Sequence, residues 1–505
     1  MNSNPSTQQC RPRTIAKPLA LAVAAITLGP LICASARADE LSDLKEQMQT
    51  LSKRLSDLEA KEAKEAKEKE AREKAAPPPL ASAALPPPPQ VAPALKTDQN
   101  GVQLDPTVNV ISLYTSSNTR LSLYGLLEAT LSHVDHQTSS GGTTNGFQVA
   151  WFSGNRLGFD AMHALPGVGE ALNMPDLKIM SKLETEYELP TGDMDTANVF
   201  FNRDAWLGFY SNTLGKLTFG RQNTLTRDFT QNWGDTYGTP EVVLKEGGYS
   251  NVNNFKQFIF YSGAPTGTRV NSGINWKKKW DEHWVTGLGW AFGSGGGGGS
   301  GDVGNGGSYP GDFNNGTNKA VSVAYNRLAV GPTLVNANVN WDHGTNHDLA
   351  HDSELIGGNV VYGPWRANGG FAHYRAQQGL NNSIGDRHDN SWTMSGSYRL
   401  GKTEFSLGYV RMKGDHAGLN SAGNVINAYG NTAGVTTVAD GAKGTVFGAV
   451  MYHADSQTDF YVAADHFNVS GDWVIGDAQG NGNHFGVGHP YDGELELATG
   501  VRFKF

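Results

Sequence analysis

The sequence predicts an all-β fold: a transmembrane antiparallel β-barrel of about 16 strands, preceded by a short α-helical coiled coil and a Pro-rich linker. Beyond residue 119, stretch after stretch alternates apolar and polar residues. Short connections alternate along the chain with long Gly-, Asn- and Asp-rich connections. The chain ends inside an alternating stretch, on Phe505. A period of two is typical of a strand with one apolar and one polar face. The polar faces carry Asn, Lys, Glu and Arg, which suit a water-filled lumen better than a packed core.

Composition narrows the choice of class. The chain has 505 residues, 63 of them Gly, with 38% hydrophobic residues, and a mean hydropathy of -0.41. These values do not fit a helical membrane protein, and the length suits several domains or one large barrel. The net charge of -9 argues mildly against a nucleic-acid partner.

Residues 1–38 read as a signal peptide. A basic n-region precedes the apolar run "PLALAVAAITLGPLICA", and "ASARADE" offers small-x-small cleavage sites, which favours removal over a single membrane anchor. Cys10 and Cys33 both lie in this segment. The mature chain would then have no disulfide and no Cys-ligated metal, and we expect no cofactor.

Residues 39–75 predict a periplasmic coiled-coil helix. Six apolar residues repeat with 3-4-3-4-3 spacing and form an a/d seam of fewer than three heptads: Leu41, Leu44, Met48, Leu51, Leu55 and Leu58. So short a seam is marginal alone, and a solvated single helix remains the alternative. Residues 76–118 are Ala- and Pro-rich and predict an extended linker.

Residues 119–505 predict the barrel. In "RLSLYGLLEATLSHVD" one face points outward and the other inward. The outward residues are Leu121, Leu123, Leu127, Ala129 and Leu131, and the inward ones are Ser122, Tyr124, Glu128, Thr130 and Ser132. Counting back from Phe505 gives about 16 strands, an even number as bacterial barrels require. The stretch 251–280 is ambiguous, because "FKQFIFYSG" and "TRVNSGINWKKK" both read as strands. We take them as one long strand, or the first as part of an inward-folded loop.

Five segments together resemble the general diffusion porins of Gram-negative bacteria, of the trimeric, 16-stranded type: "LSLYGLLEA", "SGNRLGFDA", "SKLETEYEL", "NRDAWLGFYSNTLGKLTFGRQ" and "ATGVRFKF". The resemblance implies an outer-membrane homotrimer, surrounded by outer-membrane lipid, through which small hydrophilic solutes and ions diffuse passively. It also implies that the barrel assembly machinery reads the ending Val501, Phe503 and Phe505. The sequence contains no nucleophile elbow, phosphate loop or paired catalytic set, so we expect no enzyme.

Two other functions remain open. The coil and linker are similar in layout to those of sugar-specific porins, although the barrel sequence does not resemble that group. A substrate-specific channel, for a sugar for example, is therefore one alternative. The other is an envelope tether, in which the periplasmic coil reaches peptidoglycan.

The resemblance implies that the loop after the fifth strand, residues 223–255, folds into the lumen and narrows it. Its acids are Asp228, Asp235, Glu241 and Glu246. Arg156 and Arg203 match the family's basic ladder, and Lys182 and Glu184 face inward by alternation. Acids and bases facing each other across a narrow aqueous gap would sort ions and orient dipolar solutes.

Aromatic residues recur every fourth position in the same loop, at Phe229, Trp233 and Tyr237. They would either pin the loop to the barrel wall or form a slide for sugar rings.

Arg221 has the parity of outward residues, and an Arg facing lipid is costly. We therefore expect it at the rim, or in a trimer contact with Asp193 or Asp195 of a neighbouring subunit.

Three histidines, His343, His347 and His351, lie four apart among acids. We expect them in an exposed extracellular loop; on a helix, the same spacing could bind a metal.

Overall fold

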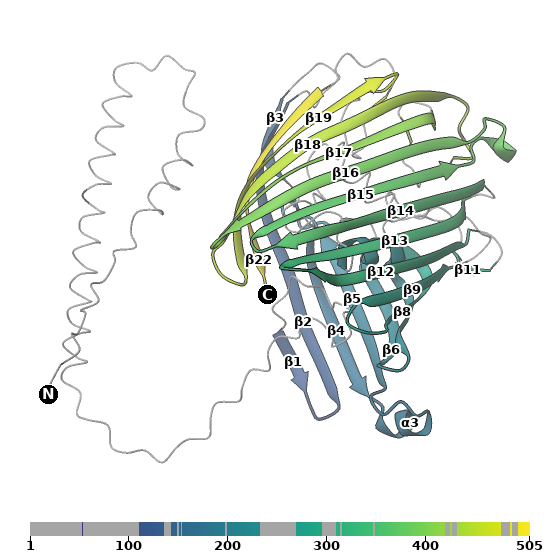
Figure 1. Ribbon diagram of the computed structural model, residues 1–505, viewed down its shortest axis with the longest axis vertical. Helices are drawn as coiled ribbons and strands as arrows, with labels where there is room; N and C mark the ends of the chain where they lie inside the picture. The colour runs from purple at the N-terminus through teal and green to yellow at the C-terminus, as the bar shows by residue number, and fades with distance from the viewer. Residues whose placement is uncertain are drawn as a thin grey trace. The chain divides into compact units, whose positions relative to one another are not determined.

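The computed structural model describes most of the region expected to form the barrel (Figure 1). The described residues are Lys53, 111–135, 143–148, 151–152, 154–196, 199–232, 269–294, 310–313, 316–346, 349–419, 425–426, 432–475, 485–486 and 493–505. The chain divides into two units, residues 1–90 and 91–505. The signal peptide, the coiled-coil seam and most of the linker therefore lie outside the described residues.

Sixteen strands close into an antiparallel barrel, which confirms the barrel part of the predicted fold class (Figure 1). The strands of the wall, in chain order, are β2 (Thr119–Val134), β4 (Asn155–Ala164), β5 (Lys178–Tyr187), β6 (Asp204–Ser211), β7 (Gly215–Asn223), β8 (Arg269–Lys279), β9 (Trp284–Ala291), β12 (Asn318–Val330), β13 (Thr333–Asn346), β14 (Leu349–Tyr362), β15 (Trp365–Ala376), β16 (Arg387–Leu400), β17 (Thr403–Gly418), β18 (Val438–His453), β19 (Thr458–Gly471) and β22 (Gly493–Lys504). The first strand pairs with the last from Leu126↔Lys504 to Val134↔Glu496. In the ambiguous stretch, β8 begins only at Arg269, and "FKQFIFYSG" lies outside the described residues.

The predicted alternation of faces is confirmed. On β16, Trp392 and Met394 are exposed on the outer surface, while Ser391 and Thr393 between them are buried on the lumen side. On β2, Leu131 is 58% exposed and its neighbour Thr130 is buried. An apolar outer surface and a polar inner surface match lipid outside and water inside.

The connections at the end of the barrel that holds Phe505 are mostly tight turns. Gly331, Gly363 and Gly401 have positive φ values of 60°, 52° and 60° in three of these turns, a conformation that glycine adopts without strain. In the turn between β8 and β9, the backbone N–H groups of Trp284 and His283 donate to Asp281 and hold the pKa of that carboxyl below its usual value. The connections at the other end are mostly long, as predicted.

The histidine segment is the exception, and its prediction as an exposed loop was wrong. β13 continues to Asn346 and β14 begins at Leu349, so the segment is a hairpin of the barrel wall. His343 is on the outer face and contacts Asp352 at 2.7 Å, whereas His351 is buried and contacts the Tyr374 hydroxyl at 2.7 Å. Strands that extend beyond the hydrocarbon region tolerate polar residues on both faces, so a polar segment can still be strand. His347 lies outside the described residues.

Smaller elements decorate the wall. β1 (Ile111–Thr115), within the expected linker, pairs with β2 beyond the point where β22 ends. β3 (Thr144–Gln148) pairs with residues 130–134 of β2. β4 pairs with residues 119–126 on the same edge of that strand. The remaining elements are α3 (Pro166–Ala171), α4 (Leu225–Asn232), β10 (Gly293–Ser294), β11 (Pro310–Asp312), η2 (Leu380–Asn382), β20 (Val474–Ile475) and β21 (Phe485–Gly486). Among the described residues, no helix is both long and apolar enough to cross a membrane.

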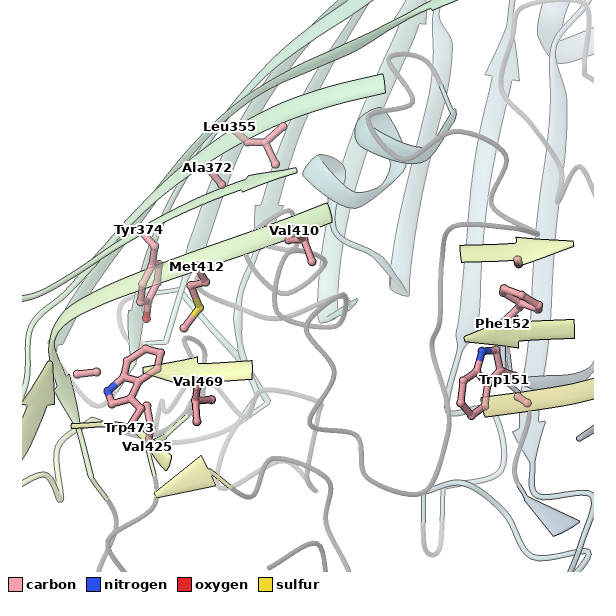
Figure 2. Packing of buried hydrophobic residues seen from close by; sticks show 14 of the residues in the cluster. Trp151, Phe152, Leu355, Ala372, Tyr374, Val410, Met412, Val425, Val469 and Trp473 are labelled. Carbon is pink, nitrogen blue, oxygen red and sulfur yellow. The ribbon is translucent and has the colours of Figure 1, made fainter. Parts of the chain in front are cut away.

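The largest apolar cluster lies on the lumen side of the C-terminal strands (Figure 2). Trp473 follows β19 and packs among inward-facing side chains such as Met412 and Val469. Its indole ring lies over Gly414 and Gly441, where a Cβ atom would approach within 2.7 Å and 2.2 Å of it. The start of the connection after β19 therefore folds inward and packs against the wall.

Candidate pore constriction

α4 lies inside the barrel and opens the loop after β7. Thr224 precedes the helix, and its hydroxyl accepts a hydrogen bond from the Arg227 backbone N–H at 3.4 Å, which caps the helix N-terminus. The helix contacts β9, β12, β13 and β14. The lumen face of these four strands is called the helix-bearing wall below. The predicted inward folding is thus observed for residues 225–232.

Apolar contacts fix α4 to the helix-bearing wall. Leu225 and Phe229, one helical turn apart, form a buried cluster with Val285, Ala320 and Ala324. Phe229 is 0% exposed, so it pins the helix to the wall, as one of the two interpretations expected. A Cβ atom on Gly287 of β9 would lie 2.7 Å from the Phe229 ring, so only glycine fits at that point. Trp233 and Tyr237 lie outside the described residues.

Asp228 is the one loop acid, of the four expected, within the described residues; Asp235, Glu241 and Glu246 lie outside them. Its carboxylate pairs with Lys277 of β8 and accepts a hydrogen bond from the Asn223 side chain at 2.9 Å. Asp228 therefore links α4 to β8, the neighbour of β9 in the barrel wall. In the described part of the chain, its side-chain partners are Lys277 and Asn223, and not Arg156, Lys182 or Arg203.

Those three bases lie on the lumen face of β4, β5 and the start of β6, which is called the charged wall below. The Lys182 ammonium lies 3.2 Å from Glu184 and 3.4 Å from Asp204. Arg203 pairs with Glu184 at 2.5 Å and also with Glu186. The structure thus brings Lys182, Glu184 and Arg203 together, and much of their charge is balanced on the same wall.

Glu184 is the centre of the charged wall and is 1% exposed. Besides its two bases, it accepts a hydrogen bond from the Tyr124 hydroxyl at 2.7 Å. Tyr124 reaches it from β2 across Gly158, where a Cβ atom would lie 2.2 Å from the Tyr124 ring. Arg156, on β4, pairs in register with Glu186 and donates from Nε to the Gly154 carbonyl at 3.1 Å. Whether these residues form the narrowest point of the pore stays a prediction.

A second buried cluster, missed by sequence reasoning, closes the barrel. Glu128 of β2 and Arg502 of β22 are direct partners across the joint between first and last strands, with Nε–Oε2 3.1 Å. The same carboxylate accepts the backbone N–H groups of Trp151 and Phe152 at 2.7 and 2.8 Å and the Tyr461 hydroxyl at 2.9 Å. The alternation placed Glu128 and Arg502 inward, but only the register brings them together.

Arg221 is half-buried and bonds within its own chain. Its Nε donates to the Asn202 carbonyl at 2.7 Å, and Nη1 donates to the Asn271 side chain at 2.6 Å. The Asn202 side chain in turn donates to Asp195 at 3.1 Å. Asp193 is exposed in the same connection. Arg221 and Asp195 thus meet the same residue of one protomer, and their contact between subunits stays a prediction.

The C-terminus is fixed to the first strand. The Phe505 backbone N–H donates to the Gly125 carbonyl at 3.0 Å, and the Gly125 N–H donates to the Phe505 carbonyl at 2.8 Å. The rings of Phe503 and Phe505 stack with centroids 5.8 Å apart, and Val501 pairs with Ala129. Within the described residues, no group of three or more His, Cys, Asp or Glu side chains is placed to hold a metal.

A closed barrel of sixteen antiparallel strands, apolar outside and polar inside, with a loop folded into its lumen, is a channel of the outer-membrane type. The chain belongs to the Gram-negative porin family, whose sequence profile matches residues 110–472. It is therefore an outer-membrane channel. No curated protein sequence matches the chain.

Solved structures show the same fold. The barrel is similar to an anion-selective porin from Comamonas acidovorans, at 19% identity and a TM-score of 0.53, covering 77% of this chain and 100% of that one. It is also similar to a loop-deletion mutant of OmpT from Vibrio cholerae, at 14% identity and a TM-score of 0.50, covering 77% and 100%. At these identities the likeness concerns the fold alone.

Proposed function

We propose that the channel lets small hydrophilic solutes and ions diffuse passively, with weak charge selectivity set by the charged wall. The observation that supports this most is the pairing of Arg203 with Glu184 and Glu186, and of Lys182 with Glu184 and Asp204. A ladder of bases would favour anions, whereas bases balanced by neighbouring acids favour neither sign strongly. Ion selectivity would then depend on both halves of each pair.

Opposite substitutions on this wall test the proposal. Replacing Arg156 and Arg203 together by Ser should shift the reversal potential in a salt gradient toward cation preference. Replacing Glu184 and Glu186 together by Gln should shift it toward anion preference, because the same arginines then lose their counter-charges. Glu354→Gln is the matched control, since Glu354 is exposed on the outer face of β14. Unchanged reversal potentials in both double variants would contradict the proposal.

A substrate-specific channel remains the second candidate, because the coil-plus-linker layout is shared with sugar-specific porins. Addition of a sugar to the bath distinguishes the two. Passive diffusion predicts a conductance proportional to salt and unaffected by millimolar sugar. Concentration-dependent block would instead support a sugar site.

We also propose that the barrel assembles as a homotrimer in the outer-membrane lipid, after insertion by the barrel assembly machinery, with residues 39–110 in the periplasm. The family resemblance supports the trimer, and Arg221 on the outer face of β7 suits a protein neighbour better than lipid. β1 enters the barrel at the end that holds Phe505, which in an even-stranded barrel is the periplasmic end. The coil would then be free to contact peptidoglycan.

A further inference from the structure

The seam between α4 and the wall strands β12 and β13 is lined by buried side-chain oxygen atoms. They come from Thr230 of α4, Ser322 of β12, and Asn340 and Asp342 of β13. All four side chains are at most 1% exposed. The seam lies away from the charged wall, and the proposed function does not use it.

Strand register and helix contacts place these four residues near one another. Ala320 pairs with Asp342, and Ser322 pairs with Asn340. α4 packs on Ala320 and Ala324, so Ser322, which lies between them on the same face, is under the helix. The other face of α4 lies over β13, because the Thr226 hydroxyl donates to Asp342 Oδ2. Thr230 follows Thr226 by one helical turn, which brings it to the level of Asn340.

Each of the four residues has an oxygen atom that the described residues leave unsatisfied. These atoms are Asp342 Oδ1, Asn340 Oδ1, Ser322 Oγ and Thr230 Oγ1. The Asn340 side-chain amide donates to Asn338 Oδ1 at 2.5 Å, which fixes the donor end of the group and leaves its carbonyl oxygen available.

The carboxylate of Asp342 makes the seam electrostatically incomplete. Its one hydrogen bond in the described part of the chain comes from Thr226, and no Lys, Arg or His there pairs with it. A buried carboxylate without a counter-charge is costly, and so is each buried oxygen without a partner. Native structures compensate such groups with an ion, a proton or ordered water.

We propose that this seam binds one hard monovalent cation, of the Na⁺ class, between the Asp342 carboxylate and the neutral oxygens of Asn340, Ser322 and Thr230. An all-oxygen site selects hard cations. A single carboxylate balances one positive charge, whereas calcium sites usually supply several carboxylates. The cation ties α4 to the helix-bearing wall, and so stabilises the lumen loop whatever solutes pass through the pore.

The test measures the melting temperature of the folded, full-length channel in detergent at pH 7, in sodium chloride and in choline chloride at equal ionic strength. Choline cannot replace a small cation in the seam, because it is larger and alkyl groups surround its charged nitrogen. The expected result is a melting temperature about 2–4 °C lower in choline. Asp342→Asn should abolish the difference and Ser322→Ala should reduce it. Asp415→Asn, which removes an exposed carboxylate beside Lys413, should keep it.

A second measurement needs no variant. Diffraction from wild-type crystals soaked in a thallium(I) salt should show an anomalous peak between α4 and β13. Equal melting temperatures in both salts, a difference that persists in Asp342→Asn, or ordered water without anomalous signal would each overturn the proposal. A stability that ignores cation identity but falls as pH rises would show instead that Asp342 is held by a proton.

Discussion

The two sides of the lumen solve the problem of burying polar groups in different ways. On the charged wall, acids and bases lie side by side, so that Lys182, Glu184 and Arg203 lie within 3.2 Å of an opposite charge. On the helix-bearing wall, the strands under α4 present mostly small or uncharged side chains such as Ala320, Ser322 and Asn340, and Asp342 is the one buried acid among the described residues of these strands. A charged surface can stay wet and face the pore. A surface that receives a helix must be small and nearly neutral.

If the charged wall sets selectivity, as proposed above, the difference assigns a separate property of the channel to each side. Charges on the charged wall would act on passing ions through their electric field, because these side chains lie on the lumen face of the barrel. The helix-bearing wall acts by holding α4 in place. Substitutions on the two walls should therefore change different properties of the channel: reversal potential for the first, conductance for the second.

The largest expected effect is on stability and comes from a substitution at the joint between the first and last strands, β2 and β22. Glu128→Ala leaves Arg502 buried beside no carboxylate from β2 and removes the acceptor for the Trp151 and Phe152 N–H groups. Breaking a buried pair from one side costs about 3–5 kcal/mol. Urea unfolding in detergent should show that loss in the free energy of unfolding.

The control is Glu354→Ala, which removes an exposed glutamate from β14. Surface changes of this kind usually stay within about 0.5 kcal/mol. If Glu128→Ala and Glu354→Ala lose the same free energy, the joint does not depend on the Glu128–Arg502 pair.

The next largest effect is expected from a substitution that weakens the packing of α4 on the helix-bearing wall. Phe229→Ala removes the ring that packs against Gly287 and Val285 and should cost about 3 kcal/mol of docking energy for α4. Because the freed helix would sample the lumen and obstruct it from time to time, single-channel conductance should become noisier and lower on average, with little change in reversal potential. Phe371→Ala, on the exposed outer face of β15, is the matched control. A quiet channel of unchanged conductance would mean that Phe229 does not hold the loop.

Sequence alternation predicted the barrel well, because side-chain direction along a strand depends only on position. It assigned Glu128 and Arg502, and Lys182 and Glu184, to the lumen, and the structure confirms these orientations. The family resemblance also predicted that the loop after the fifth strand folds inward.

Pairing across strands could not be read in the same way. The partner of Arg203 depends on register, and register brings Glu184 and Glu186 to it from the neighbouring strand. A sequence signal did exist, since Lys182, Glu184 and Glu186 share one face of β5 and would balance one another. The histidine hairpin failed for another reason: polar composition suggested a loop where backbone pairing continues.

A smaller effect on stability is expected from a change at the C-terminus, which belongs to neither wall and so serves as a reference for both. Deleting Phe505 removes two backbone hydrogen bonds to Gly125, worth about 1–2 kcal/mol together. We expect refolding in detergent to remain largely intact, while the amount of folded barrel in cells falls because the assembly signal is lost. Heat-modifiable gel mobility of both preparations measures this. Normal assembly in cells would show that the ending is not a signal.

The smallest expected effect on channel properties comes from removal of the N-terminal extension. If three barrels associate, their linkers bring three short heptad seams to high local concentration, which turns a marginal coil into a formed one. Fewer than three heptads still contribute little beside an interface between barrel walls. Removal of residues 39–95 should therefore leave a trimeric channel of unchanged conductance and reversal potential.

Native mass measurement of the truncated protein, beside circular dichroism of a peptide of residues 39–75, tests this. The peptide alone should be mostly unfolded at micromolar concentration, because short isolated helices are marginal in water. A monomeric truncated barrel would make the coil the trimerisation element. A stably helical, trimeric peptide would show that the Lys/Glu-rich half beyond Leu58 adds more than ion pairs on a helix surface usually do.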